Sequence, residues 1–151
     1  MTPTTMDRKT LCKAVFNACY RQGNFKLRSG QTSTEYFDKY RFESQPHILK
    51  AVAEQLKKFI PPGVDALAGL EMGGIPIATA LSLATGIPTV FVRKKAKDYG
   101  TEQFAEGFDI KGKKLLIIED VVTNVYVVGK DHNGNKVRVD IIDSVDIESI
   151  E

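Results

Sequence analysis

Residues 115–120 read LLIIED: four large aliphatic side chains, followed by the carboxylates of Glu119 and Asp120. A short, continuous apolar run of this kind predicts a buried strand of a parallel sheet. Two adjacent carboxylates repel each other, and folding alone rarely requires them at the end of a strand. They suit a ligand with two neighbouring hydroxyl groups, such as a ribose, or a metal ion. From the spacing alone, a solvated loop after a core strand explains them equally well.

The segments before this run alternate between strand and helix patterns. Residues 65–70 form an apolar strand pattern, and residues 76–84 form a small-residue helix pattern that Gly86 closes. Residues 89–93 and 114–118 are the next strand patterns. This order predicts an α/β fold with parallel βαβ units, a mostly parallel central sheet and flanking helices. Ligands of such sheets bind beyond the carboxyl ends of the strands.

The first and last parts of the chain have other patterns. Asp7 is expected to cap a helix that runs to about residue 22, short strands are expected at 25–27 and 36–40, and a helix is expected from Pro46. At the other end, alternating residues around Asn133-Gly134 predict a β-hairpin. We therefore expect a single domain over 1–151. Its parts are the N-terminal helix and hood-like strands over 7–44, the core over 46–123 and the hairpin end over 124–151.

Composition limits the class of protein. The chain has 151 residues, 42% of them hydrophobic, which fits one globular core. Its net charge of +2 gives no argument for a nucleic-acid or membrane partner, and no apolar run reaches membrane-spanning length. Cys12 and Cys19 lie too far apart on one predicted helix to form a disulfide. Two unpaired cysteines favour a reducing, cytoplasmic setting.

Two further segments of interest follow predicted strands. The first contains two adjacent glycines and consists of Glu71, Met72, Gly73 and Gly74. Bare N–H groups at the start of a helix form an anion site, although an ordinary glycine turn has the same pattern. The second segment is basic and contains Arg93, Lys94, Lys95 and Lys97. It begins a long polar connection to residue 112, which suits either a solvated stretch or a mobile lid over a polyanion.

Near the N-terminus, Arg28, Tyr36 and Phe37 offer hydrogen bonds and stacking to a planar base. Aromatic side chains packing on an edge strand are an equally good interpretation of the pattern. Taken together, the segments 25–30, 33–44, 68–76, 91–100, 106–107 and 115–123 resemble orotate phosphoribosyltransferase, of the type I phosphoribosyltransferase family. The resemblance covers roughly residues 10–123, in the order that the family has.

The resemblance implies an activity and a role for each segment. The family transfers the phosphoribosyl group of phosphoribosyl pyrophosphate to orotate with Mg²⁺, as a homodimer whose lid reaches into the partner's site. Expected to bind the phosphoribosyl pyrophosphate and its ribose are Glu119, Asp120, Thr123, Arg93, Lys94 and Lys97. Expected to be catalytic are Lys97, Lys94 and Asp120. The pyrophosphate loop would be Glu71, Met72, Gly73 and Gly74, and orotate would meet Arg28, Tyr36 and Phe37. No residue is expected to bind the metal directly, since the substrate pyrophosphate holds most of the Mg²⁺ ion.

The chain departs from the family pattern after Thr123. The family continues with Thr-Gly-Gly, whose backbone cradles a 5′-phosphate, whereas this chain has Asn124-Val125-Tyr126 and a hairpin pattern in place of a helix. The family pattern also has a lysine at the position of Gly73 in many relatives. Three interpretations stay open: an orotate phosphoribosyltransferase, a catalytically impaired relative that binds ligand or forms dimers, and a transferase for another base.

Overall fold

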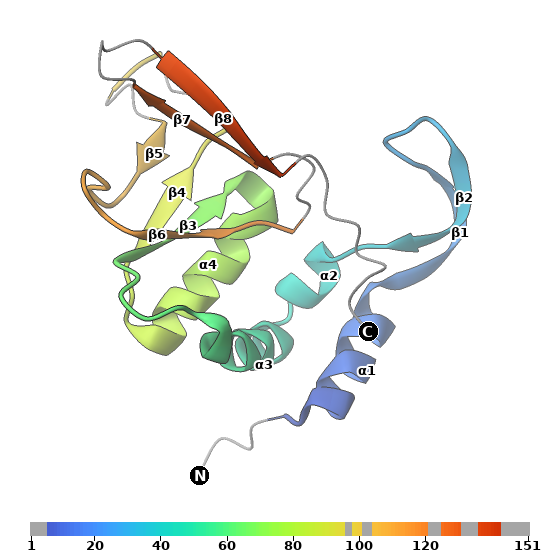
Figure 1. Cartoon of the computed structure of the whole chain (residues 1–151). Coiled ribbons are helices and arrows are strands. Elements are labelled where there is room, and N and C mark those ends of the chain that lie inside the picture. Colours follow the sequence, from blue (N-terminus) through green and yellow to red (C-terminus); the bar gives the residue numbers. More distant parts are fainter. Residues whose placement is uncertain (1–5, 96–97, 101–103, 121–124, 131–135, 143–151) are drawn as a thin grey trace. The chain divides into compact units, whose positions relative to one another are not determined.

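The computed structural model of the chain describes residues 6–95, 98–100, 104–120, 125–130 and 136–142 (Figure 1). The chain divides into two compact units, Met1–Ile118 and Glu119–Glu151. The first unit contains helices and two sheets, and the second contains a hairpin. The expected α/β fold with a hairpin at its end is confirmed. The expectation of one domain over the whole chain stays a prediction.

A mixed sheet forms the centre of the first unit, with the strand order β5-β4-β3-β6. Its strands are β3 (Ala66–Leu70), β4 (Thr89–Val92), β5 (Ala105–Glu106) and β6 (Leu115–Ile118). Strand β3 pairs in parallel with both β4 and β6, as predicted, and β5 pairs antiparallel with β4. The short β5 falls inside the connection that was predicted to be a loop from residue 94 to residue 112. It covers an edge of the sheet that would otherwise present unpaired backbone groups.

Helix α4 (Glu71–Thr85) joins β3 to β4, and α3 (Pro46–Leu56) with the 3₁₀ turn η1 (Lys57–Phe59) packs against it. The predicted start of α4 at residue 76 was wrong, because the helix begins directly after β3. The two glycines therefore lie in its first turn and not in a preceding loop. Its predicted end at Gly86 is confirmed. Gly86 has the left-handed φ of 77° that often ends a helix, and its N–H donates a hydrogen bond to the carbonyl oxygen of Ser82.

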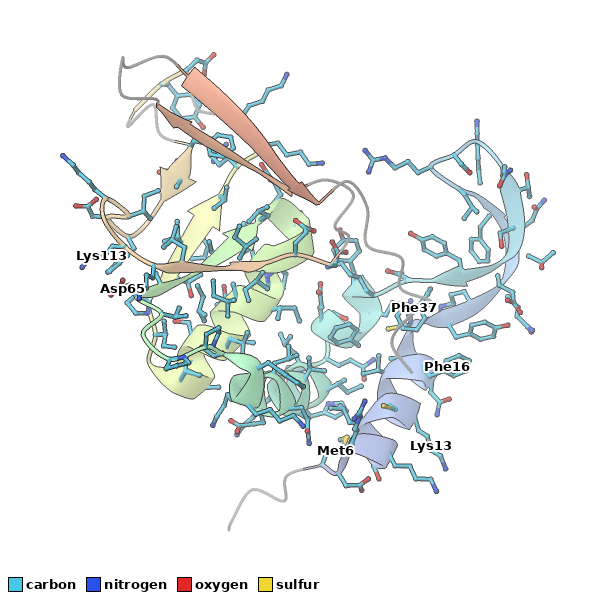
Figure 2. All side chains as sticks on the ribbon, viewed as in Figure 1. Met6, Lys13, Phe16, Phe37, Asp65 and Lys113 are labelled. Atoms are coloured by element: carbon cyan, nitrogen blue, oxygen red, sulfur yellow. The ribbon has the colours of Figure 1, made fainter. Side chains whose placement is uncertain are left out.

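Buried side chains lie on both faces of β3, the central strand. On the helix face, Leu67 packs with residues of α3 and α4; this cluster is Ala53, Leu67, Ala78 and Leu81. On the opposite face lie Ala66, Ala68 and Val90. Because successive side chains of a strand point to opposite faces, a strand buried on both sides needs apolar residues throughout. Figure 2 shows the side chains that fill the space between the sheet and the helices.

The N-terminal part begins with α1 (Arg8–Cys19), whose first turn is capped by Asp7, as predicted: the carboxylate accepts from the N–H of Thr10 at 3.0 Å. The predicted extension to residue 22 was wrong, because the backbone becomes extended at Tyr20. Strand β1 (Tyr20–Lys26) pairs antiparallel with β2 (Thr32–Phe37), and α2 (Tyr40–Glu43) follows. The predicted strand over 36–40 was therefore misplaced. Pairing within the hairpin outweighs the helical periodicity of residues 20–22.

The second unit contains β7 (Val125–Lys130) and β8 (Lys136–Ile142), which pair antiparallel. This confirms the predicted hairpin. Its expected turn at Asn133-Gly134 and residues 145–151 lie outside the described residues. Among the helices that the structure describes, none has both the length and the apolar character needed to cross a membrane.

Candidate functional site

The carboxyl ends of three strands meet at one edge of the mixed sheet. Leu70 at the end of β3 is level with Val92 of β4, and Gly69 is level with Ile118 of β6. The segments beginning at residues 71, 93 and 119 follow directly from these strand ends. At the opposite edge, near Asp65 and Lys113 in Figure 2, the carboxylate of Asp65 accepts from the N–H of Lys114 at 2.8 Å. The segments that follow the parallel strands therefore lie at the edge where open α/β sheets bind their ligands.

Glu71 connects two of these segments. Its carboxylate accepts a hydrogen bond from the backbone N–H of Lys94 at 2.5 Å, so the start of α4 is tied to the start of the basic segment. Glu71 also has φ 43°, a left-handed conformation that is uncommon for a residue with a side chain. Such local strain persists only where the surroundings enforce it. The structure thus brings together Glu71 and Lys94, which the sequence placed in separate candidate sites.

Gly74 is the point at which α4 meets β6. A Cβ atom built on Gly74 would lie 1.8 Å from the carbonyl oxygen of Ile118. That distance is far inside van der Waals contact, so only glycine allows this approach. Ile118 is the residue directly before Glu119 in the chain. The second glycine of the predicted pyrophosphate loop therefore has a packing role, whatever it binds.

Gly73 is held from outside the loop by a lysine that the sequence analysis did not single out. The ammonium group of Lys39 donates to the carbonyl oxygen of Gly73 at 2.6 Å and to the carboxylate of Glu43 at 3.0 Å. The i,i+4 spacing of Lys39 and Glu43 is a helical ion-pair signal. We missed it because residues 36–40 were assigned to a strand.

The first turn of α4 offers backbone donors to an anion. The first four N–H groups of any α-helix lack an acceptor within the helix, and the helix dipole makes that end positive. Met72 in this turn has 63% of its surface exposed, so solvent reaches it. Phosphate groups bind readily at such a helix end.

The basic segment is only partly covered by the structure. Lys94 is exposed. The guanidinium of Arg93 lies 3.9 Å from the carboxylate of Glu106, which is an ion pair between β4 and β5. Because 44% of the Arg93 side chain stays exposed, this pair contributes little to stability and leaves the cation accessible to an anion. Lys97, a predicted catalytic residue, lies outside the described residues.

Glu119 and Asp120 begin the second unit. One carboxylate oxygen of Glu119 accepts from the backbone N–H of Asp120 at 2.9 Å, and the Asp120 side chain is exposed. This local hydrogen bond holds the Glu119 carboxylate against the backbone of the next residue. Thr123, the third predicted ribose residue, lies outside the described residues.

The residues predicted to approach orotate lie on the β1–β2 hairpin. Arg28 is in its exposed turn, and the ring of Tyr36 stacks on Phe25 with ring centroids 5.4 Å apart. Phe37 is the next residue along β2, so its side chain points to the opposite face from Tyr36. A hydrogen bond from the Tyr20 hydroxyl to Glu35 raises the pKa of Tyr20 because it stabilises the neutral phenol.

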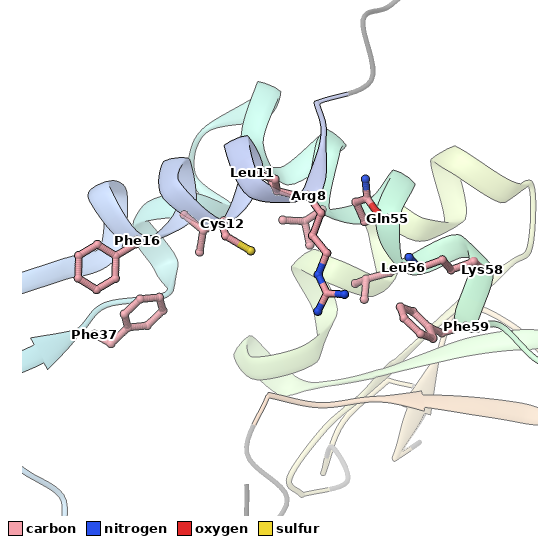
Figure 3. A pocket seen from close by; sticks show the side chains of 11 residues that line it. Arg8, Leu11, Cys12, Phe16, Phe37, Gln55, Leu56, Lys58 and Phe59 are labelled. Carbon is pink, nitrogen blue, oxygen red and sulfur yellow. The ribbon is translucent and has the colours of Figure 1, made fainter. Parts of the chain in front are cut away.

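Phe37 instead lines an apolar groove of about 420 Å³. Figure 3 shows this groove, to which α1 contributes Leu11, Cys12 and Phe16, and α3 with η1 contributes Leu56 and Phe59. None of the residues at the ends of the parallel strands takes part in it. The proximity of Phe37 to orotate stays a prediction.

Metal ions in proteins are held mainly by His, Cys, Asp and Glu side chains. Across the described ranges, no three His, Cys, Asp or Glu side chains gather as they would around an ion. One Glu71 carboxylate oxygen already accepts from Lys94. Mg²⁺ is usually bound through one or two carboxylates together with substrate phosphates, and the carboxylates after the strand ends are of the type that suits such an ion.

The chain resembles known proteins over most of its length. Residues 41–124 match the phosphoribosyl transferase domain. The orotate phosphoribosyltransferase of Nocardioides is 52% identical over 119 residues, which cover 79% of this chain and 66% of that protein. The orotate phosphoribosyltransferase of Methanocaldococcus jannaschii is 43% identical over 122 residues, which cover 78% of this chain and 68% of that protein.

A solved structure agrees with these sequence relatives. The orotate phosphoribosyltransferase of Mycobacterium tuberculosis, in complex with Fe(III) dicitrate, has a TM-score of 0.64 and 28% identity, covering 75% of this chain and 66% of that one. The chain thus spans about two thirds of the length of the relatives it matches. By sequence match, identity and fold, the chain belongs to the orotate phosphoribosyltransferase family of type I phosphoribosyltransferases.

Proposed function

We propose that this chain is an orotate phosphoribosyltransferase, a glycosyltransferase of de novo pyrimidine synthesis. It would transfer the phosphoribosyl group of phosphoribosyl pyrophosphate to orotate, giving orotidine 5′-monophosphate and pyrophosphate. The observation that carries the proposal is the first turn of α4, which is tied through Glu71 to Lys94 at the sheet edge. This arrangement supports binding of a diphosphate in a chain that belongs to the family.

The chemistry requires one bond to break and one to form at the sugar. The bond between ribose C1 and the pyrophosphate oxygen breaks, and a bond from C1 to an orotate nitrogen forms. Positive charge develops on the ribose while negative charge gathers on the leaving diphosphate. Arg93, Lys94 and Lys97 would stabilise the diphosphate together with the N–H groups of the pyrophosphate loop (Glu71, Met72, Gly73 and Gly74). Positioning and electrostatics are then the main contributions of the protein.

The ribose would be held by the acidic pair that follows β6. Glu119 and Asp120 would accept hydrogen bonds from the two ribose hydroxyls, with Thr123 beside them. Their negative charge would also favour the cationic sugar in the transition state. The Asp120 carboxylate is exposed and therefore accessible to such a ligand.

A Mg²⁺ ion would neutralise charge on the diphosphate when bound. The ion would arrive with the substrate, because phosphate oxygens are ligands that Mg²⁺ prefers. Orotate would lie against Arg28 and Tyr36, with Phe37 as a further candidate. We also propose a cytoplasmic homodimer in which each protomer lends its lid to its partner.

One observation favours a second candidate, a relative that binds phosphoribosyl pyrophosphate without efficient transfer. Strand β7 begins at Val125, where the family pattern has the glycines of its 5′-phosphate loop. A β-branched residue does not allow the close backbone approach that glycine does. Losing two or three charge-assisted hydrogen bonds of about 1.5–3 kcal/mol each would weaken substrate binding by orders of magnitude.

Loss of orotate absorbance tests the proposal and separates the candidates. Purified full chain is mixed with Mg²⁺, phosphoribosyl pyrophosphate and orotate. Turnover that requires all three supports the transferase. No turnover at high enzyme concentration, combined with calorimetric binding of phosphoribosyl pyrophosphate, supports the second candidate. Turnover with a different base alone supports a transferase of altered specificity.

A further inference from the structure

We propose that Lys39, the N-cap residue of α2, is a positioning residue that fixes the pyrophosphate loop, with Glu43 as its partner. This inference rests on the proposed function, since it concerns how that site is organised. It starts from one contact: the Lys39 ammonium donates to the carbonyl oxygen of Gly73 at 2.6 Å. The two residues are 34 positions apart in the chain, so the contact belongs to the tertiary structure.

The peptide between Gly73 and Gly74 transmits the effect. No peptide bond in the described chain is cis, so the carbonyl of Gly73 and the N–H of Gly74 point in opposite directions from one rigid plane. An ammonium that holds the carbonyl oxygen therefore also sets the direction of the N–H. The N–H of the same Gly73 is one of the four at the start of α4 that have no acceptor within the helix, so a fixed Gly73 keeps this donor directed toward an anion. Packing against Ile118 fixes Gly74, whereas Gly73 has the backbone freedom of glycine and gains a fixed contact from the lysine.

The lysine is itself held in place. Its side chain is 17% exposed and that of Glu43 is 5% exposed, with 3.0 Å between the ammonium nitrogen and the carboxylate oxygen. The backbone around it is also fixed, since the N–H of Asp38 donates to the carbonyl of Cys19 at 2.9 Å. A long side chain that is paired and largely buried loses little further freedom when ligand binds. The contact is therefore preorganised in the ligand-free protein.

Charge gives the lysine a second effect on the loop. Gly73 carries no side chain, so a cation at this point must come from another element. Glu43 neutralises the net charge of the pair at a distance, whereas the Gly73 carbonyl contacts the ammonium itself at 2.6 Å. The low exposure of the pair reduces screening by solvent. Lys39 thus favours an anion at the first turn of α4 while it holds the turn's shape.

Calorimetry with full-length variants tests this role, using Mg²⁺-pyrophosphate and orotate as separate probes. Lys39→Met should weaken pyrophosphate binding about tenfold or more, and orotate binding should change less than about twofold. Lys39→Arg should restore part of the pyrophosphate affinity. Because Lys39→Met removes the cation that pairs with a buried carboxylate, the double variant Lys39→Met/Glu43→Leu is measured as well. It should fold and still bind pyrophosphate weakly.

The matched control is Lys57→Met. Lys57 also pairs with a glutamate, Glu54, at 2.9 Å, but on an exposed helix surface. This variant should bind pyrophosphate like the parent chain. A double variant that binds pyrophosphate as tightly as the parent would overturn the inference, and so would equal losses for pyrophosphate and orotate. Absence of pyrophosphate binding by the parent chain would instead overturn the proposed function, and the positioning role with it.

Discussion

Gly74 shows how closely the candidate site depends on single residues. A methyl group at this position would lie 1.8 Å from the carbonyl oxygen of Ile118, so Gly74→Ala must move either α4 or β6. We expect the free energy of unfolding to fall by about 1–3 kcal/mol, the usual cost of overpacking. Urea unfolding measures it. Thr79→Ala is the control, because Thr79 lies on an exposed part of the same helix. Equal stability of Gly74→Ala and the parent would contradict the described packing.

Cys19 and Cys12 differ in their environment, and thiol labelling distinguishes them. Cys12 is exposed and Cys19 is buried. Burial raises the pKa of the Cys19 thiol, so less of the reactive thiolate is present near neutral pH. We expect a maleimide to modify Cys12 rapidly in the native chain, and Cys19 only after unfolding. With Cys12→Ser, native labelling should almost disappear. Equal rates for both thiols would mean that Cys19 is not buried at the end of α1 as described.

At the residue scale, the sequence indicated which residues belong to the candidate site better than it indicated which residues contact one another. It located the glycines and the basic cluster, because residue type and neighbouring strands are visible in one dimension. It did not find Lys39, whose importance comes from a carbonyl group 34 residues away. It also treated Tyr36 and Phe37 as one group, although strand geometry sends them to opposite faces.

Helix α1 offers a test at the scale of an element. The Asp7 carboxylate accepts from the hydroxyl and the N–H of Thr10, and these hydrogen bonds lower the pKa of Asp7. A lowered folded pKa stabilises the protein above the ordinary carboxyl pKa, and this contribution is lost as the pH falls through the folded value. We therefore expect the parent to melt above Asp7→Asn at pH 7, with the difference shrinking below about pH 4.

Asparagine is a suitable comparison, because it caps helices without a charge. Thermal unfolding of both proteins between pH 3 and pH 7 measures the effect. A constant difference in melting temperature over this range would show that the Asp7 charge has no part in capping.

The elements of the parallel sheet were the most predictable part of the fold. Residues 66–70 and 115–118 are apolar throughout, and such runs have few other stable arrangements. The start of α4 was less predictable, since adjacent glycines usually end helices or form turns. Here the tight approach to Ile118 and the hydrogen bond from Lys94 to Glu71 hold them in a helical turn. The short β5 exists only through its pairing with β4, which no local pattern indicates.

At the scale of the whole molecule, a substitution in the acidic pair distinguishes an effect on catalysis from an effect on folding. Asp120 is exposed, so Asp120→Asn should leave the midpoint of urea unfolding almost unchanged. If its carboxylate stabilises charge on the ribose, turnover should fall about a hundredfold or more. The comparison is made on one preparation, by orotate absorbance and by urea unfolding. Parallel losses of turnover and stability would mean that the acidic pair is structural.

The family match and the C-terminal hairpin meet at one point of the chain. The family match runs through residue 124, and β7 begins at Val125. The sequence predicted the hairpin, because alternating residues on both sides of Asn133-Gly134 favour two paired strands.

Calorimetric titration of the full chain with phosphoribosyl pyrophosphate and Mg²⁺ is the most direct test of the strand-end site. We predict saturable binding with one site per chain, and competition by pyrophosphate, since both ligands would use the first turn of α4 and the basic segment. Gly74→Ala should weaken both ligands together. Binding of neither ligand at millimolar concentration, by a chain that melts cooperatively, would contradict the proposal that this edge of the sheet binds the diphosphate.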